Sequence, residues 1–357
     1  LPWLENGFLR VESPGARSGL VRFRLSGVLR FEQDLQLLNH QRAVLAGPVG
    51  ITHWLGTPHV VRPRHDVDYL MATRLVPRYR IPAAVSTKLL SRLATRYTPL
   101  ERAGYPLGMG AAGYDPSIGL LPEWDVAYLV TRADPRAFDA VTIQACAAGR
   151  YGTHFRDEST QAPALPSAYP SLVLDGASAG LTSSGASSRG QYTPAATGPV
   201  PPAFATSHHS SMGYLAHLLT GWHYFAEELQ FVALANHYKQ TDSTREGARG
   251  LLLTQAGANT TRGAGWAMRT LAQATAVTNP GDPLHAELTA VIDNNIDHYQ
   301  SRYVSGQHNA LGLVQPYSNY NGTQDPWTSA SWMDDFFTAA WGYLKDLQVC
   351  SPARTPA

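Results

Sequence analysis

The sequence predicts an α+β fold, mainly α, in which an N-terminal sandwich-like β-sheet segment precedes an α/α toroid of helical hairpins. Residues 20–31 alternate apolar and polar side chains with period two around a Ser-Gly turn, as a β-hairpin does. Residues 207–238 carry apolar side chains at helical spacing, interrupted once by a Thr-Gly pair, as two antiparallel helices do. The same pattern of helix, threonine, turn and helix occurs three times, at Thr131, Thr220 and Thr278.

Residues 1–80 are expected to be rich in β-strands. Beyond the hairpin, further strands are predicted at residues 44–45, 59–61 and 70–79. Residues 81–114 form a connector, in which a short helix over residues 83–97 precedes a glycine-rich run.

Residues 115–350 are expected to form the toroid domain. A loop over residues 159–207, rich in Ala, Ser, Gly and Pro, is either a lid that faces a substrate or an excursion over the surface. The predicted hairpins are too few to close a toroid, so the ring is open, lacks hairpins, or is completed by a second copy or another chain. The predicted helices lie at 118–131, 135–148, two within 207–238, 245–255, 263–277, 283–304 and 332–348.

Charge and composition exclude several functional classes. The 357 residues include 28 basic and 27 acidic side chains, a formal net charge of +1, so no nucleic-acid partner is expected. No apolar run reaches the roughly 18 residues of a membrane-spanning helix, so no membrane partner is expected. No signal peptide is visible, and the initial leucine suggests a processed or truncated product. Cys146 is expected to be a buried free thiol, because the only other cysteine is far away in the sequence.

The connections that lead into the inner helices of a toroid all open on one face. Polar side chains on these connections should therefore converge there, together with neighbouring aromatic rings. A concave face of this composition suits a carbohydrate. The predicted substrate-binding residues on these connections are His154, Arg156, Arg262, Trp266, Tyr317, Tyr320 and Trp327.

The predicted architecture resembles polysaccharide lyases that combine a β-sandwich with a helical toroid. The segment from Ser331 to Phe337, Ser-Trp-Met-Asp-Asp-Phe-Phe, is also similar to the Trp-x-Asp-x-x-Tyr/Phe motif of unsaturated glucuronyl hydrolases. That family places its motif in the middle of the toroid, whereas here it lies near the end of the chain. The resemblance implies that Asp334 acts as a catalytic acid.

A lyase that acts on a uronic acid neutralises the sugar carboxylate, removes the proton at C5 and protonates the leaving oxygen. His208 or His209 is the expected base or carboxylate neutraliser, and Tyr214 the expected acid. Arg156 or Arg262 is the expected partner of the carboxylate. Each candidate also has a structural explanation, since a His-His pair before a helix can bond backbone groups and Tyr214 lies within the apolar pattern.

Two alternatives remain open beside the lyase. A glycoside hydrolase would use Asp334 or Asp335, one of which is explained by stabilisation of a helix N-terminus. A protein without catalytic activity would bind a glycan and show no turnover.

No cofactor is expected, and no metal ligand set is predicted. The sequence has no HExxH or CxxC spacing, no P-loop and no dinucleotide-binding fingerprint. A structural divalent cation in the Asn- and Asp-rich loop over residues 315–325 is not excluded. The expected partner is an acidic oligo- or polysaccharide, and the expected location is secreted or periplasmic.

Overall fold

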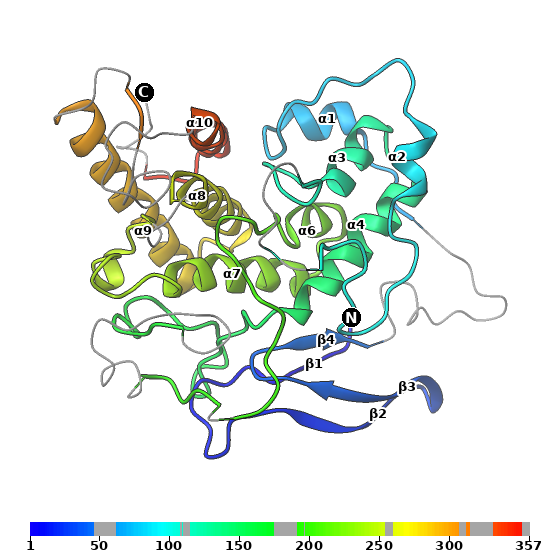
Figure 1. Ribbon diagram of the computed structural model, residues 1–357. Helices are drawn as coiled ribbons and strands as arrows, with labels where there is room; N and C mark the ends of the chain where they lie inside the picture. The colour runs from blue at the N-terminus through cyan, green and yellow to red at the C-terminus, as the bar shows by residue number, and fades with distance from the viewer. Residues whose placement is uncertain are drawn as a thin grey trace.

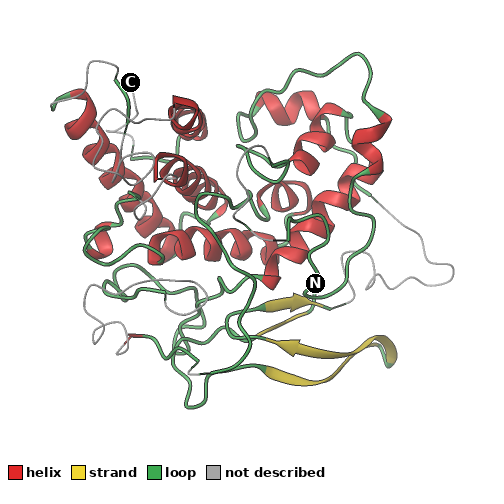
Figure 2. Cartoon of the chain, in the orientation of Figure 1, coloured by secondary structure: helices red, strands yellow, loops and turns green. Residues whose placement is uncertain are grey.

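Two small antiparallel sheets lie beside a larger helical body in the computed structural model, which is a mixed α+β structure (Figure 1). Figure 2 shows the strands gathered at one end, with helices making up most of the rest. The structure describes residues 1–45, 62–107, 109, 115–174, 191–195, 197–253, 260–306, 312–314 and 331–351.

The predicted β-hairpin is confirmed. Strand β2 (Arg17–Leu25) pairs antiparallel with β3 (Val28–Leu37), and Leu25 faces Val28 across the turn. The two turn residues, Ser26 and Gly27, have φ values of 50° and 76°. Positive φ at both positions matches the right-handed twist of the two strands, which explains the tight turn.

The second sheet pairs the first strand of the chain with the strand that follows the β2–β3 hairpin. Strand β1 (Trp3–Glu5) pairs with β4 (Arg42–Val44), which accounts for the strand predicted at residues 44–45. The strand predicted at 59–61 lies outside the described residues. The described strands form two separate pairs, which is less than the sandwich-like sheet expected from the sequence.

The strand predicted over residues 70–79 is wrong. Residues Val67–Ala72 form helix α1, and the Asp66 carboxylate accepts a hydrogen bond from the Tyr69 backbone N–H at 3.1 Å. An aspartate in this position satisfies an N–H that the first helical turn leaves unpaired.

The predicted helical hairpins are confirmed at three places. A helix predicted over 245–255 is wrong, since its described part holds a short 3-10 turn, η3 (Gly247–Arg249), with positive φ at Glu246, Gly247 and Gly250. The helix predicted over 83–97 shortens to α2 (Thr87–Ser91). The hairpin helices are α3 (Glu123–Val130) with α4 (Pro135–Ala147), α6 (Tyr214–Thr220) with α7 (His223–Tyr238), and α8 (Thr260–Val277) with α9 (Pro283–Tyr299), followed by η4 (Gln300–Val304) and α10 (Ser331–Leu347).

The threonine at the end of the first helix makes the same hydrogen bond in all three hairpins. The hydroxyls of Thr131, Thr220 and Thr278 each donate a hydrogen bond of 2.7 Å to the carbonyl of an alanine four residues earlier. The backbone N–H groups of Thr131 and Thr278 donate to the same carbonyls, so the hydroxyl is a second donor at the point where the helix ends. The sequence pattern thus corresponds to a repeated helix terminus.

Helix α8 lies between α7, α9 and α10 and packs against all three. The β-segment shares the helical core, because Leu9 and Val44 belong to the same buried cluster as the helices. Cys146 is buried and free, as predicted. The described parts of the loop over 159–207 carry no named helix or strand, and closure of the helices into an α/α toroid stays a prediction.

Candidate functional site

Side chains from three separate segments meet near the start of α8 and α10. We call these residues the aromatic–arginine cluster: His208, Arg262, Trp266, Trp332 and Phe336. His208 lies before α6, Arg262 and Trp266 belong to the first turns of α8, and Trp332 and Phe336 lie in the first turns of α10. Because α8 packs along α10, these first turns hold the rings and the guanidinium together.

The pair at the centre of the cluster is His208 and Arg262. The Nη2 atom of Arg262 lies 2.7 Å from Nε2 of His208, and both side chains are buried. A guanidinium has only donors, so Nε2 of His208 accepts and the ring is neutral at that nitrogen. The proton is then on Nδ1, which donates to the Ser207 hydroxyl at 2.8 Å. A neutral imidazole is the protonation state that a general base requires, and here its lone pair accepts from Arg262.

Aromatic rings extend from this pair to the surface. The Arg262 guanidinium carbon lies 5.2 Å from the centroid of the Trp332 ring, within cation–π range. Phe336 lies between Trp332 and Trp266, with centroid distances of 5.7 Å and 5.1 Å. Trp332 and Phe336 are 39% and 36% exposed, whereas Trp266 is buried. Sequence reasoning missed Trp332 and Phe336 as site residues, although their spacing of four places them on one face of α10.

Asp334 and Asp335 occupy the first turn of the same helix. The Asp334 carboxylate accepts a hydrogen bond of 2.6 Å from the Val314 backbone N–H, so it anchors a preceding segment. Burial raises the pKa of Asp334 above its usual value, and the charge of Asp335 acts in the same direction. Asp335 is exposed. The two carboxyl groups therefore differ in environment although they are adjacent in sequence.

His209 and Tyr214 both have their polar atoms bonded within the fold. His209 is buried, with Nδ1 2.7 Å from the Thr206 carbonyl and Nε2 2.7 Å from the Thr270 hydroxyl. Burial, together with the charge of Arg269, lowers its pKa well below the ordinary value. Tyr214 is buried, its hydroxyl donates to the Leu75 carbonyl at 2.6 Å, and burial raises its pKa. We therefore assign both to the packing of α6 rather than to the candidate site.

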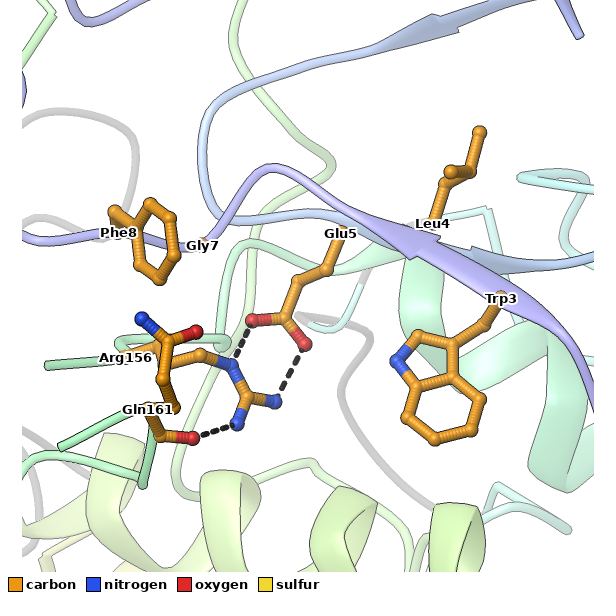
Figure 3. Close-up of a pocket in the computed structure, with 7 residues that line it drawn as sticks. All are labelled: Trp3, Leu4, Glu5, Gly7, Phe8, Arg156 and Gln161. Carbon is orange, nitrogen blue, oxygen red and sulfur yellow. Dashed lines mark hydrogen bonds and ion pairs between the residues drawn. The ribbon is translucent and has the colours of Figure 1, made fainter. Parts of the chain in front are cut away.

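Arg156 has no N–H left for a ligand. Its five donors all have acceptors: two go to Glu5, two to Glu227 and one to the Gln161 carbonyl. Figure 3 shows Arg156 between Glu5 and Gln161 at a cavity of about 300 Å³. The expected contact of Arg156 with a substrate carboxylate does not fit this arrangement.

His154 belongs to the same buried network. Its Nδ1 lies 2.8 Å from the His40 carbonyl and its Nε2 lies 3.1 Å from the Glu228 carboxylate, and both of these groups are acceptors. Both ring nitrogens therefore face groups of the same chain. His154 and Glu228 are completely buried, so the predicted contact of His154 with a substrate does not fit either.

The network is completed by Arg42 on β4. Its guanidinium donates to Glu228, to Glu227 and to the Tyr224 carbonyl, each at 2.7 Å. Burial alone would raise the pKa of Glu228, but the charges of Arg42 and His154 outweigh it and lower that pKa to about 2. Two arginines and His154 face three glutamates, Glu5 included. This internal charged cluster ties the β-segment to α7, and sequence reasoning missed it.

Three predicted substrate-binding residues, Tyr317, Tyr320 and Trp327, lie outside the described residues. The cation site considered over residues 315–325 lies there too. Within the part of the chain that the structure describes, no three or more His, Cys, Asp or Glu side chains are grouped as a metal ion would require.

Comparisons of this chain with models of protein families, with curated proteins and with solved structures gave no match. Among the described helices, none has the length and apolar character needed to cross a membrane.

Proposed function

We propose that this chain is a carbohydrate-active enzyme that cleaves a uronic-acid-containing polysaccharide by β-elimination. The contact between His208 and Arg262, beside two exposed aromatic rings, carries the proposal. It supplies a neutral base, a cation for the sugar carboxylate and apolar faces for a pyranose ring, all from residues far apart in the sequence.

In the proposed reaction, Arg262 donates hydrogen bonds to the uronate carboxylate and stabilises the negative charge that develops on it. Binding of the carboxylate draws the guanidinium away from Nε2 of His208, which frees that lone pair. His208 then removes the proton at C5. The electron pair of the C–H bond forms the double bond between C4 and C5, and the bond from C4 to the glycosidic oxygen breaks. The leaving oxygen takes a proton from water or from His208, since Tyr214 is committed to Leu75.

The proposal extends to the surroundings of the site. We place the confirmed hairpins in an α/α toroid whose inner helices begin at the aromatic–arginine cluster. A second copy or another chain would complete a ring that is open in this chain. A polysaccharide substrate would be met outside the cytoplasm, in a secreted or periplasmic location.

A second candidate is a glycoside hydrolase that uses Asp334 as its general acid. The raised pKa of Asp334 favours it, because a general acid must hold its proton near neutral pH. Asp335 would then activate water or stabilise the positive charge that develops on the sugar.

Ultraviolet absorbance during incubation with a panel of acidic polysaccharides tests the proposal. Elimination produces a double bond conjugated to the carboxylate, which absorbs, whereas hydrolysis produces only new reducing ends. The lyase predicts rising absorbance that His208→Ala and Arg262→Gln abolish. His223→Ala is a matched control, because the side chain of His223 is 73% exposed and lies outside the cluster.

Other outcomes contradict the lyase. Reducing ends without absorbance, lost in Asp334→Asn, would establish the hydrolase. Saturable glycan binding without turnover, retained in His208→Ala and Asp334→Asn, would establish a binding protein without catalytic activity.

A further inference from the structure

A second cavity, of about 650 Å³, lies in the segment between α2 and α3 and shares no residue with the aromatic–arginine cluster. We call it the arginine pocket. Arg96 and Arg102 line it from this segment, and Arg150 at the end of the 3-10 turn η1 (Ala148–Arg150) lines it from another. Glu101 is the one acidic residue in its lining. The lining therefore carries three positive charges and one negative charge, a balance of +2.

Arg150 is the most informative member of the arginine pocket. Its Nε and Nη1 atoms are buried, and neither has a hydrogen-bond partner among the described residues. The guanidinium lies 5.6 Å from the centroid of the Tyr151 ring, a contact that uses the ring face and leaves the N–H groups unpaired. Buried N–H groups of a cation are costly without acceptors, and such groups in folded proteins commonly face water or an ion.

The other two arginines of the pocket contrast with those elsewhere. Arg42 and Arg156 each face several carboxylates, as described above, whereas Arg96 and Arg102 are exposed and take part in no ion pair among the described residues. Arginines collected around one cavity without carboxylate partners favour a negatively charged ligand.

The backbone of the pocket is held in an uncommon conformation. Leu100 and Ala103, which both line the cavity, have φ values of 65° and 48°. Residues with a side chain seldom occupy this left-handed region, and such conformations occur often at ligand sites. The two residues flank Glu101 and Arg102, so their conformation sets the direction in which these side chains leave the chain.

We propose that the arginine pocket binds a phosphate or sulfate group carried by a small molecule. Guanidinium groups pair with tetrahedral oxyanions through several charge-assisted hydrogen bonds. The excess of two positive charges matches a doubly charged group better than a single carboxylate. A volume of about 650 Å³ exceeds that of a bare ion and falls in the range of pockets for small organic ligands.

Isothermal titration calorimetry on the full chain tests this inference, with inorganic phosphate, inorganic sulfate and glucose 6-phosphate as probes and glucose as the neutral control, all at matched ionic strength. Saturable binding of at least one anion and none of glucose is expected. Tighter binding of glucose 6-phosphate than of phosphate would identify an esterified ligand, and equal binding would identify the free oxyanion.

Variants of the arginines decide whether the cavity is the site. Arg150→Gln is expected to weaken binding about tenfold or more, because hydrogen bonds to a charged group are lost. Arg96→Gln with Arg102→Gln should also weaken it and make it less sensitive to salt. Arg80→Gln, an exposed arginine outside the lining, is the matched control and should bind as the unaltered chain does.

Absence of saturable binding for all three anions would overturn the inference. The same holds if Arg150→Gln folds and binds with unchanged affinity. If Arg150→Gln does not fold, the double variant of the exposed residues Arg96 and Arg102 still tests the inference. Unchanged affinity of that double variant for the anions would also overturn the inference.

Discussion

Arg42 on β4 donates a hydrogen bond of 2.7 Å from Nε to the carboxylate of Glu228 on α7, and both side chains are completely buried. This contact links two residues that are 186 positions apart in sequence. It belongs to the internal charged cluster that also contains Glu5, Arg156 and His154. Each charge in that cluster is compensated by its neighbours, so removal of one member leaves the others buried without their partners.

Replacement of Arg42 by methionine is expected to destabilise the chain by about 3–5 kcal/mol, since the buried Glu228 then keeps only His154 as a side-chain partner and Glu227 loses one of its two arginines. Chemical denaturation in urea measures the change. Arg22→Met is the matched control, because the pair of Arg22 and Glu32 lies on the surface and such pairs contribute about 0–1 kcal/mol. Equal midpoints for the two variants would show that the buried cluster adds nothing to stability.

The threonines at the helix ends should differ in their effect on stability. Thr278 is buried and also accepts a hydrogen bond of 2.9 Å from the Gln230 amide, so Thr278→Val leaves a buried donor unpaired and should cost about 1–3 kcal/mol. Thr131 is half-buried, and Thr131→Val should cost about 0.5–1.5 kcal/mol. Thermal denaturation of both variants checks the order, and a larger loss in Thr131→Val would contradict it.

Acid should weaken the fold through His40 before it affects the carboxylates. Burial lowers the pKa of His40 from 6.5 to about 4 and outweighs the hydrogen bonds of Nδ1 to two backbone carbonyls, which act in the opposite direction. Its Nε2 is buried with no acceptor among the described residues. The unfolded chain then binds more protons than the folded chain between pH 6.5 and 4, so stability falls as the pH falls through this window. His40 should account for a loss on the order of 3 kcal/mol.

Urea titrations at intervals from pH 7 to pH 4 measure that loss. His40→Gln should be less stable at pH 7 and should show a flatter dependence on pH across the same window. A dependence as steep as that of the unaltered chain would assign the loss to other groups, such as the buried His209 and His237.

Tyr214→Phe separates a packing role from a catalytic role. Its hydroxyl bonds the Leu75 carbonyl, which also accepts from Tyr343, so the variant should lose only about 1 kcal/mol of stability. Turnover of any polysaccharide that the chain cleaves should stay unchanged. A fall in the maximal rate with unchanged substrate affinity would show that the Tyr214 hydroxyl takes part in the reaction.

The elements that were predicted correctly from the sequence are those whose conformation depends on residues close to one another in the chain. The β-hairpin follows from alternation around Ser26 and Gly27, and the helical hairpins follow from apolar spacing that ends at a threonine. The error at residues 70–79 came from treating an apolar run as a strand, while the local cause of α1 was the aspartate at its N-terminus. The error at 245–255 came from two glycines that the chain uses at positive φ.

The candidate site was predictable in part. His208, Arg262 and Trp266 were expected to converge, and the structure brings His208 and Arg262 into contact. His154 and Arg156 carry the same residue types but bond internal carboxylates instead. A single sequence does not show which of two arginines meets a carboxylate of its own chain. The one available signal was the pair Glu227 and Glu228 inside an otherwise apolar helix, since buried charges require partners.

The contact between β4 and α7 also sets an order of events during synthesis. At roughly 5–20 residues per second, the ribosome would need about 10–40 seconds after making Arg42 to produce Glu228. The β2–β3 hairpin can close early, because its partners are adjacent. Strand β4 can then pack against α4 and η1, whereas Arg42 meets Glu227 and Glu228 only after α7 has been made. The nascent chain therefore carries the Arg42 guanidinium without its carboxylate partners on α7 for that interval, and holding chaperones would be expected to act there.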